Sequence, residues 1–375
     1  MMINRRSNKH GRGRFWIGAT ACCLAFIVYG CLDVIDIEVS GEAREKLVIQ
    51  GHLIVGDPSL VQVKVSKLFD FTATSKRPTT ARQVSLIDEN GRSIVLKSLG
   101  QGDYAISIPR DYPDFSVELG RFYRLRLETF DGRIFESDPE KGLAVPRMDD
   151  LSFQLVQGQW PDATGGFRPQ ELIRYTIDTP LRTSEQDDDL HLRWQTEWTF
   201  KVQDSPYQHW IEQKTCYVTQ QLDVTALDIF APRAYETDYL FDHVVYENAI
   251  TRNYGEGLVF TVIQQSMDEN AYNYFDQVAQ NTFREGSMFE RPPGTLVSNI
   301  HNITDAEDAP FGYFFVTQQD TLHTYVSPEA VGSPPHYCPP PGGILTMSGY
   351  CADFICCDCL SVDNSTVTKP DFWEE

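Results

Sequence analysis

The stretch Val61-Gln62-Val63-Lys64-Val65-Ser66 alternates valine with polar residues over three repeats. Successive side chains of a β-strand point to opposite faces, so this alternation predicts a strand with one buried face and one polar face. The preceding residues 46–55 are also rich in strand-forming side chains. The folded part of the chain is therefore expected to begin with a β-sheet.

Turn sequences divide the next hundred residues into short strand-like segments. Val84–Ile87 runs into the turn sequence Asp88-Glu89-Asn90-Gly91 and resumes at Ser93–Leu96, which predicts a hairpin. Residues 103–128 contain two more alternating segments. Six or seven short strands separated by turns are typical of an immunoglobulin-like β-sandwich, which we predict over residues 46–146.

The sequence changes in character after Pro146, and a chain of 375 residues is expected to form two domains. Leu172–Ile177 and Leu190–Val202 are strand-like, and the second carries aromatic residues at even spacing on one face. Gly312–Val316 is typical of a further buried strand. We therefore predict a larger β-rich second domain over residues 147–337.

A helix is expected near residues 267–283 of this domain. Ser266-Met267-Asp268-Glu269 fits a capping box, in which the serine caps the helix and the glutamate reaches back to it. Apolar side chains then recur at helical spacing, at Ala271, Tyr274, Phe275, Val278 and Ala279. We interpret this stripe as core rather than as a ligand site.

The acidic run Glu185–Asp189 has two interpretations. It is either a solvated loop between two strands or a calcium site. We favour the loop, because the run lacks the spaced oxygen ligands and the turn glycine of an EF-hand loop.

The first thirty residues resemble a bacterial lipoprotein signal peptide. Five basic residues precede an uncharged apolar segment, residues 15–30, which is shorter than the ~20 residues of a membrane-spanning helix. Gly30 and Cys31 end this segment, so we predict cleavage after residue 30 and lipidation of Cys31. A tether over residues 31–45 would then join the lipid anchor to the sandwich.

Two alternatives remain open at this end of the chain. The first is an uncleaved anchor helix, since Tyr29 stands where a lipobox usually has a small residue. The second is processing beside Cys22 and Cys23, although this would leave the apolar residues 24–29 exposed on the mature chain.

The charge of the chain argues against nucleic acid as a partner. The formal net charge is −21, and loss of residues 1–30 would leave 27 Lys and Arg against 53 Asp and Glu, or −26. Such a charge repels a phosphate backbone. We interpret the acidic surface as one that keeps a secreted protein soluble, with binding of cations or basic partners as the alternative.

The cysteines become an even set once the signal peptide and Cys31 are set aside. The six that remain are Cys216, Cys338, Cys351, Cys356, Cys357 and Cys359. In an oxidising compartment they predict up to three disulfides whose connectivity the sequence leaves open. A metal site is the alternative, but the paired spacing of zinc ligands is missing. We expect a Cys-rich tail over residues 338–375 that packs on the second domain, with Trp373 buried beneath it.

No catalytic signature is present in the sequence. It lacks a nucleophile-elbow, zinc-protease, phosphate-loop or dinucleotide-binding motif, and the seven histidines after Cys31 are scattered. We therefore predict that the protein is not an enzyme and that it needs no cofactor or metal.

Trp160 and Phe167 are the candidate ligand-binding residues. They sit in a glycine-rich loop, where an exposed ring can stack on a sugar or anchor a protein partner. The alternative is that these rings cover apolar surface near the domain boundary at Pro146.

Several short motifs follow one another along nearly all of the mature chain. They are Val34-Ile35-Asp36-Ile37 after Cys31, Leu47-Val48-Ile49-Gln50-Gly51, Gly120-Arg121-Phe122-Tyr123-Arg124-Leu125, Ala271-Tyr272-Asn273-Tyr274-Phe275, Ser298-Asn299-Ile300-His301-Asn302, Gly312-Tyr313-Phe314, Cys356-Cys357-Asp358-Cys359 and Lys369-Pro370-Asp371-Phe372-Trp373. Their order resembles a family of outer-membrane lipoproteins of Bacteroidota known as domain of unknown function 4249. Members are generally encoded beside TonB-dependent transporters of the SusC type, which implies an accessory role but no catalytic residue, cofactor or ligand.

The resemblance and the N-terminus together predict a lipid-anchored accessory or binding protein of the outer membrane, exposed at the cell surface. Its expected partners are membrane lipid, through acylated Cys31, and a SusC-type TonB-dependent transporter that it assists in substrate capture or uptake. The alternatives are a secreted hydrolase that acts on glycan or peptide with an unrecognised site, and a structural adhesin.

Overall fold

The computed structural model describes residues 46–67, 77–161, 165–183, 190–204, 211–222, 228–232, 238–282, 296–338, 351 and 353–374. Every described residue belongs to one compact unit within Arg44–Glu375. The predicted signal peptide, Cys31 and the acidic run Glu185–Asp189 lie outside the described residues. No helix in the described part of the chain has the length and apolar character needed to cross a bilayer.

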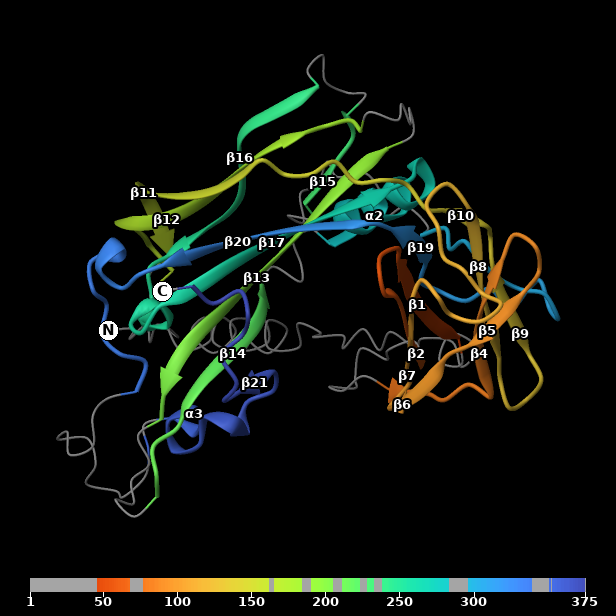
Figure 1. Cartoon of the computed structure of the whole chain (residues 1–375), viewed down its shortest axis with the longest axis horizontal. Coiled ribbons are helices and arrows are strands. Elements are labelled where there is room, and N and C mark those ends of the chain that lie inside the picture. The colour runs from red at the N-terminus through yellow and green to blue at the C-terminus, as the bar shows by residue number, and fades with distance from the viewer. Residues whose placement is uncertain are drawn as a thin grey trace, which may run out of the picture. The chain divides into compact units, whose positions relative to one another are not determined.

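The N-terminal half of this mainly β unit contains two facing sheets (Figure 1). One sheet is formed by β1 (Leu47–Ile54), β2 (Ser59–Lys67), β3 (Arg77–Pro78), β6 (Lys97–Gly100), β7 (Asp103–Ile108) and β19 (Phe314–Thr317). The other is formed by β4 (Gln83–Asp88), β5 (Ser93–Val95), β8 (Phe122–Glu128), β9 (Ile134–Ser137), β10 (Glu140–Lys141) and β18 (Ile300–Asn302). The strand orders are β19-β1-β2-β7-β6 and β18-β9-β8-β4-β5, with β3 beside β2 and β10 beside β8.

The strand order confirms the predicted immunoglobulin-like sandwich. Strands β1-β2-β7-β6 correspond to A-B-E-D of that fold, and β8 with its neighbours β4 and β9 corresponds to C-F-G. Tyr123, at the start of β8, forms a tyrosine corner: its hydroxyl accepts a hydrogen bond from the Glu118 backbone N–H at 2.7 Å. The fold therefore rests on strand alternation together with this local anchor.

The alternation in β2 is the one that the sequence predicts. Val61, Val63 and Val65 are at most 3% exposed and belong to the core between the two sheets. Gln62 and Lys64 occupy the opposite face of the strand and are exposed. This outer face of the first sheet forms part of the candidate site described below.

Two strands of this sandwich come from late in the sequence. β19 pairs in parallel with β1, and β18 pairs with β9. The segment Gly312–Val316 therefore belongs to the first sandwich, whereas the sequence places it in the second domain. A parallel pairing needs a long crossover, and here the connection from β1 to β19 includes β2 to β18, among them most strands of the second half of the fold. The sequence pattern within either strand does not predict such a pairing.

The second half also has two sheets, joined by one continuous core. The first sheet, in the order β11-β12-β16, contains β11 (Asp150–Pro161), β12 (Phe167–Pro180) and β16 (Tyr239–Ala249). The second contains β13 (His191–Gln203), β14 (Thr215–Leu222), β15 (Asp228–Phe230), β17 (Leu258–Met267), β20 (Gln319–Val326) and β21 (Ser365–Thr366). Its order is β20-β17-β13-β14-β21, with β15 beside β13.

Aromatic side chains fill the space between these two sheets. Trp194, Trp198 and Phe200 of β13 are all at most 7% exposed, which agrees with their even spacing. Tyr175 of β12 stacks on Phe260 of β17 with ring centroids 3.7 Å apart. Because one face of β13 is committed to this core, its alternate residues, Arg193 among them, face the other way.

Short helical segments complete the fold. The described ones are η3 (Arg252–Tyr254), α2 (Glu269–Thr282), η4 (Glu329–Val331), α3 (Phe354–Cys357) and η5 (Cys359–Ser361). Helix α2 confirms the predicted helix, but its cap is Asp268, whose carboxylate accepts from the Ala271 N–H at 2.8 Å. Ser266 remains in β17 because its hydroxyl donates to the Leu143 carbonyl at 2.7 Å in the segment between the sandwiches.

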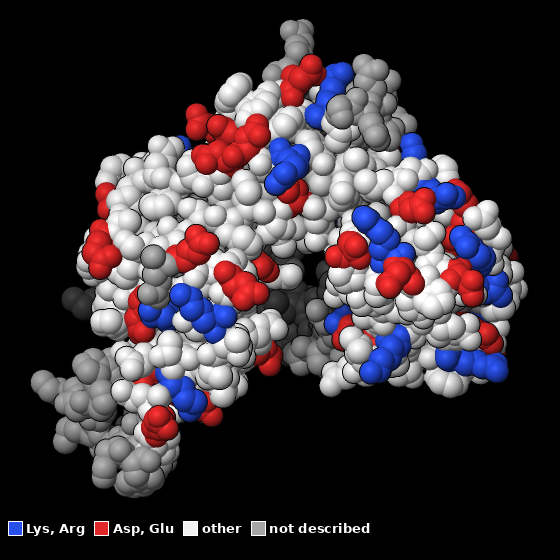
Figure 2. Space-filling model, viewed as in Figure 1, with Lys and Arg blue, Asp and Glu red and all other residues white. Residues whose placement is uncertain are grey.

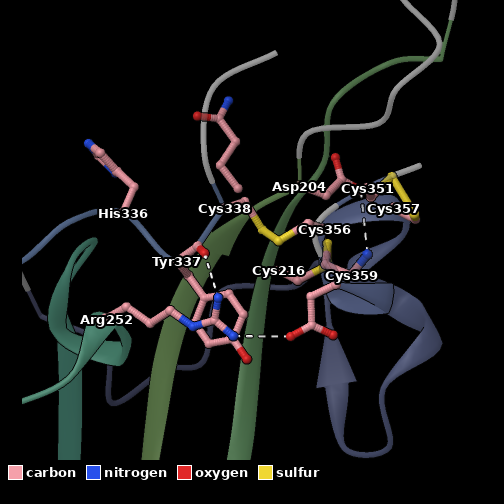
Figure 3. Close-up of a disulfide and its surroundings, with 12 residues drawn as sticks. Asp204, Cys216, Arg252, His336, Tyr337, Cys338, Cys351, Cys356, Cys357 and Cys359 are labelled. Atoms are coloured by element: carbon pink, nitrogen blue, oxygen red, sulfur yellow. Dashed lines mark hydrogen bonds and ion pairs between the residues drawn. A yellow bond between two sulfur atoms is a disulfide. The ribbon is translucent and has the colours of Figure 1, made fainter. Parts of the chain in front are cut away.

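All six cysteines named above form disulfides. The pairs are Cys216–Cys359, Cys338–Cys356 and Cys351–Cys357. The first joins the tail to β14, and the other two lie within the tail (Figure 3). The disulfide prediction is confirmed, and the structure supplies the connectivity that the sequence leaves open. None of the six thiols is left to bind a metal.

The tail is also held by packing and by charge. Trp373 is 2% exposed and packs edge-on against Tyr217, with ring centroids 4.9 Å apart. Lys214 bridges the fully buried Asp204 at 3.1 Å and Asp358 of the tail at 3.2 Å. The predicted burial of Trp373 is therefore observed.

A buried carboxyl group lies at the junction of the two halves. Glu140 is 2% exposed and accepts hydrogen bonds from the Asn299 amide at 2.6 Å and the Tyr313 hydroxyl at 3.1 Å. Burial, together with the nearby charge of Asp268, raises the pKa of Glu140 from 4.5 to about 9. Glu140 is therefore neutral in the folded protein at pH 7.

Replacement of this group should change how stability depends on pH. The folded-state pKa of Glu140 lies above the unfolded value, so its contribution is fully present below pH 4.5 and is lost as pH rises toward 9. The Glu140→Gln protein keeps an acceptor for Asn299 and Tyr313 but cannot ionise. We expect it to be more stable than wild type by about 3 kcal/mol at pH 7 and equal to it below pH 4.5. Denaturant unfolding at several pH values would measure this, and parallel pH profiles would contradict it.

Candidate functional site

A cavity of about 600 Å³ lies between the two sandwiches. Its walls are the outer face of the first sheet, the outer face of β13, β14 and β17, and helix α2. We call this space the interdomain cavity. Its volume is in the range of small-molecule binding pockets.

The N-terminal wall consists of polar side chains on the outer face of strands whose alternate side chains are buried in the sandwich core. Gln50 and His52 of β1 stand opposite Lys64 and Gln62 of β2, and Lys64 in turn stands opposite Asp103 of β7. The Lys64 ammonium lies 3.1 Å from the Asp103 carboxylate. These two charges therefore compensate each other within the wall.

The opposite wall carries one charged side chain, Arg193, which has no carboxylate of the described residues paired with it. Arg193 and Gln195 of β13, Gln221 of β14 and Gln265 of β17 line it. Arg193 and Gln265 are direct partners in the strand register. The Arg193 guanidinium lies over the ring of Phe275 at 4.6 Å, a cation–π contact.

Aromatic rings form the third side of the cavity. Tyr274 and Phe275 come from α2, whereas Tyr313 and Phe315 come from the β19 segment. Tyr274 stacks on Tyr313 with centroids 4.7 Å apart, and Phe275 meets Phe315 edge-on at 5.4 Å. These rings pack against one another, so this side of the cavity is preformed.

Burial sets the charge states of the two ionisable groups deepest in the cavity. It lowers the pKa of Arg193 to about 10, which leaves the guanidinium charged at pH 7. Burial and, secondarily, the charge of Arg193 lower the pKa of His52 to about 4, although a hydrogen bond with Gln62 opposes this. His52 is therefore a neutral imidazole at pH 7.

The lining is suited to recognition by hydrogen bonds. Five glutamine side chains reach the cavity, and each amide offers both donors and an acceptor. Together with the aromatic side and Arg193, they suit a polar ligand with apolar or ring surface. Among the described residues that line the cavity, none has the sulfur or hydroxyl of a Cys or Ser nucleophile.

Comparison with protein families places this fold in context. Residues 33–323 match the family described as domain of unknown function (DUF4249). The chain belongs to this family. Every residue that lines the interdomain cavity lies inside the matched range, whereas all the tail cysteines lie beyond it. The cavity is therefore built by the part of the chain that carries the family match.

The chain was also compared with curated proteins and with solved structures. No curated protein matches the chain. No solved structure matches it either.

The candidate residues named from the sequence lie elsewhere. Trp160 and Phe167 stand at the end of the β11–β12 hairpin, where Trp160 pairs with Arg168 and Phe167 with Pro161. They belong to paired strands rather than to a glycine-rich loop, because Gly158 is itself paired in the ladder. Phe167 is 71% exposed, and neither ring lines the cavity. Cys31 lies outside the described residues.

Sequence reasoning missed the residues that line the cavity. The even spacing of Trp194 and Trp198 implies that Arg193 and Gln195 face away from that core, which is a usable signal. The same signal marks every polar residue on an outer strand face, however, so it does not single out Arg193. What distinguishes Arg193 is the N-terminal sandwich that lies across the cavity from it.

The molecular surface agrees with the acidic composition. On the face shown in Figure 2, Lys and Arg lie scattered among Asp and Glu and form no broad basic area. Several of these cations are paired, as Arg124 is with Glu136 at 2.6 Å. This face offers no extended binding surface for a phosphate backbone.

Proposed function

We propose that this protein is a lipid-anchored binding protein of the outer membrane that captures a small polar ligand in the interdomain cavity and passes it to a SusC-type TonB-dependent transporter. The observation that carries the binding part is the cavity itself, with five glutamine amides and a charged arginine between two rigid sandwiches. Pockets at domain interfaces with a few convergent polar groups are the usual place for ligands.

The chemistry of the lining favours binding over hydrolysis. Glycoside hydrolysis commonly uses two carboxyl groups, but among the described lining residues only Asp103 is acidic, and it is paired with Lys64. Acyl transfer uses a nucleophile beside a base, and His52 has no Ser or Cys beside it in the lining. The proposal is therefore of a protein that binds without catalysis.

The proposed lipid anchor and transporter partner are supported by the sequence and by the family match rather than by the cavity. The signal-like N-terminus with Cys31 supports a lipid anchor, and membership of the family supports a role beside a transporter. Native protein, purified from membranes in mild detergent, should bring an outer-membrane β-barrel with it. Recovery as a lone monomer under several detergent and salt conditions would contradict this part of the proposal.

The anchor gives a prediction of its own. Cys31→Ser should abolish labelling with a radioactive or clickable fatty acid and release the protein from the membrane fraction, because the thiol that carries the lipid is gone. Cys22→Ser is the matched control and should leave both labelling and fractionation unchanged. Retention of the Cys31→Ser protein in membranes with the signal peptide still attached would instead support the uncleaved anchor helix.

A further inference from the structure

Two buried polar atoms on the same wall of the interdomain cavity have no partner. The Nε atom of Arg193 and the Oε1 atom of Gln265 are both removed from solvent, and neither has a hydrogen-bond partner among the described residues. Arg193 and Gln265 face each other across β13 and β17. A buried donor and a buried acceptor left open in a folded protein each destabilise it.

The charge on this wall is also uncompensated. Lys64, the other cation of the lining, is already paired with Asp103 at 3.1 Å. No acidic residue in the described part of the chain forms an ion pair with Arg193, and burial alone shifts its pKa. Arg193 is only partly exposed, and keeping a guanidinium charged there is costly unless an anion pairs with it, so the cavity as it stands lacks one negative group.

The geometry around Arg193 narrows the kind of anion. Phe275 lies 4.6 Å from the guanidinium carbon and takes none of its N–H groups as a conventional hydrogen-bond acceptor would, so these donors remain for a ligand. Planar, two-point recognition of this type matches a carboxylate. His52, neutral at pH 7, neither repels such a group nor supplies a second positive charge.

We propose that the interdomain cavity binds a small carboxylic acid that carries a hydrogen-bond donor next to its carboxylate. The carboxylate pairs with Arg193, and the Gln265 side chain turns so that its otherwise inaccessible Oε1 accepts from the neighbouring hydroxyl or N–H. The other four glutamines of the lining take the remaining polar groups of the ligand. This inference rests on the proposed binding function and specifies its ligand class.

A peptide and an acidic sugar could both supply such a carboxylate. Each is tested as an acid and as an uncharged derivative of the same compound. N-acetyl-trialanine has a carboxylate beside an amide N–H and no ammonium group, and its C-terminal amide is the neutral twin. Digalacturonate has a carboxylate beside a hydroxyl-bearing ring, and its methyl ester is the neutral twin. Isothermal titration of the full mature chain should show one acid binding at least 30-fold more tightly than its neutral twin.

Substitutions distinguish a direct contact between Arg193 and the ligand carboxylate from an effect of the protein's net charge. Arg193→Gln should weaken binding of that acid at least 30-fold and leave its neutral twin unaffected. Arg110→Gln, at a side chain that is 85% exposed, removes the same charge and should change nothing. Gln265→Met removes the acceptor and should weaken the acid about 10-fold.

A second measurement excludes a merely structural role for Arg193. Without ligand, Arg193→Gln should melt at the same temperature as wild type or higher, because an unpaired buried charge is removed. A lower melting temperature together with unchanged affinity would overturn the proposal. Equal binding of the acids and their neutral twins would also overturn it, although the protein would still be a binding protein. Failure of both acids to bind would overturn it as well. Co-purification with a β-barrel reports on the transporter role independently of these titrations.

Discussion

Removal of the Cys216–Cys359 disulfide should lower the free energy of unfolding by about 4 kcal/mol. This bond closes a sequence separation of 143 residues, the longest of the three disulfides. The entropy that a cross-link removes from the unfolded chain grows with the length of the loop that it closes. Both cysteines are fully buried, so the double substitution Cys216→Ala and Cys359→Ala avoids burying an unpaired polar group.

The matched control is the disulfide Cys351–Cys357, which spans only 6 residues. Its double alanine substitution should cost about 2 kcal/mol. Denaturant unfolding of both variants under oxidising conditions measures the difference. Equal losses from the two variants would show that loop closure is not what makes the longer disulfide stabilising.

Gly312→Ala should destabilise the protein by about 4 kcal/mol or more. Gly312 has a φ of +105°, a conformation that other residues rarely adopt, and a Cβ placed there would overlap the backbone carbonyl of Ile49. That carbonyl belongs to β1, which pairs with β19 directly after Gly312. The substitution would therefore force the late strand away from the sandwich.

Gly120→Ala provides the control for this prediction. Gly120 has a φ of +80° but has open space where a Cβ would lie. Its substitution should cost about 1 kcal/mol, which is the backbone strain alone. Thermal and denaturant unfolding report both values. If the two variants proved equally stable, the close approach of Gly312 to β1 would not matter energetically.

The gross architecture could be predicted because it depends on local patterns. The alternation at Val61–Ser66, the hairpin at Asp88–Gly91 and the helical stripe after Asp268 each reflect the geometry of one element. The number of cysteines likewise predicted that the tail would be covalently held. These inferences need only neighbouring residues or a count.

Other features could not be predicted because they depend on segments far apart in the sequence. The parallel pairing of β19 with β1 and the bond between Cys216 and Cys359 both join positions separated by more than a hundred residues. The capping box failed for a similar reason, since the hydroxyl of Ser266 bonds to Leu143 instead of to the helix. Long-range partners compete with local ones and leave no periodic trace.

The sequence by itself determined that this protein is a mainly β chain with an immunoglobulin-like sandwich and a disulfide-bonded tail. Only the tertiary structure decided that Arg193 and Gln265 would face Gln62 and Lys64 across a cavity. A polar residue on the outer face of a strand has the same periodicity whether water or a second sandwich covers it. Partial burial by the facing N-terminal sandwich is what turns an ordinary surface arginine into an unpaired charge in a cavity.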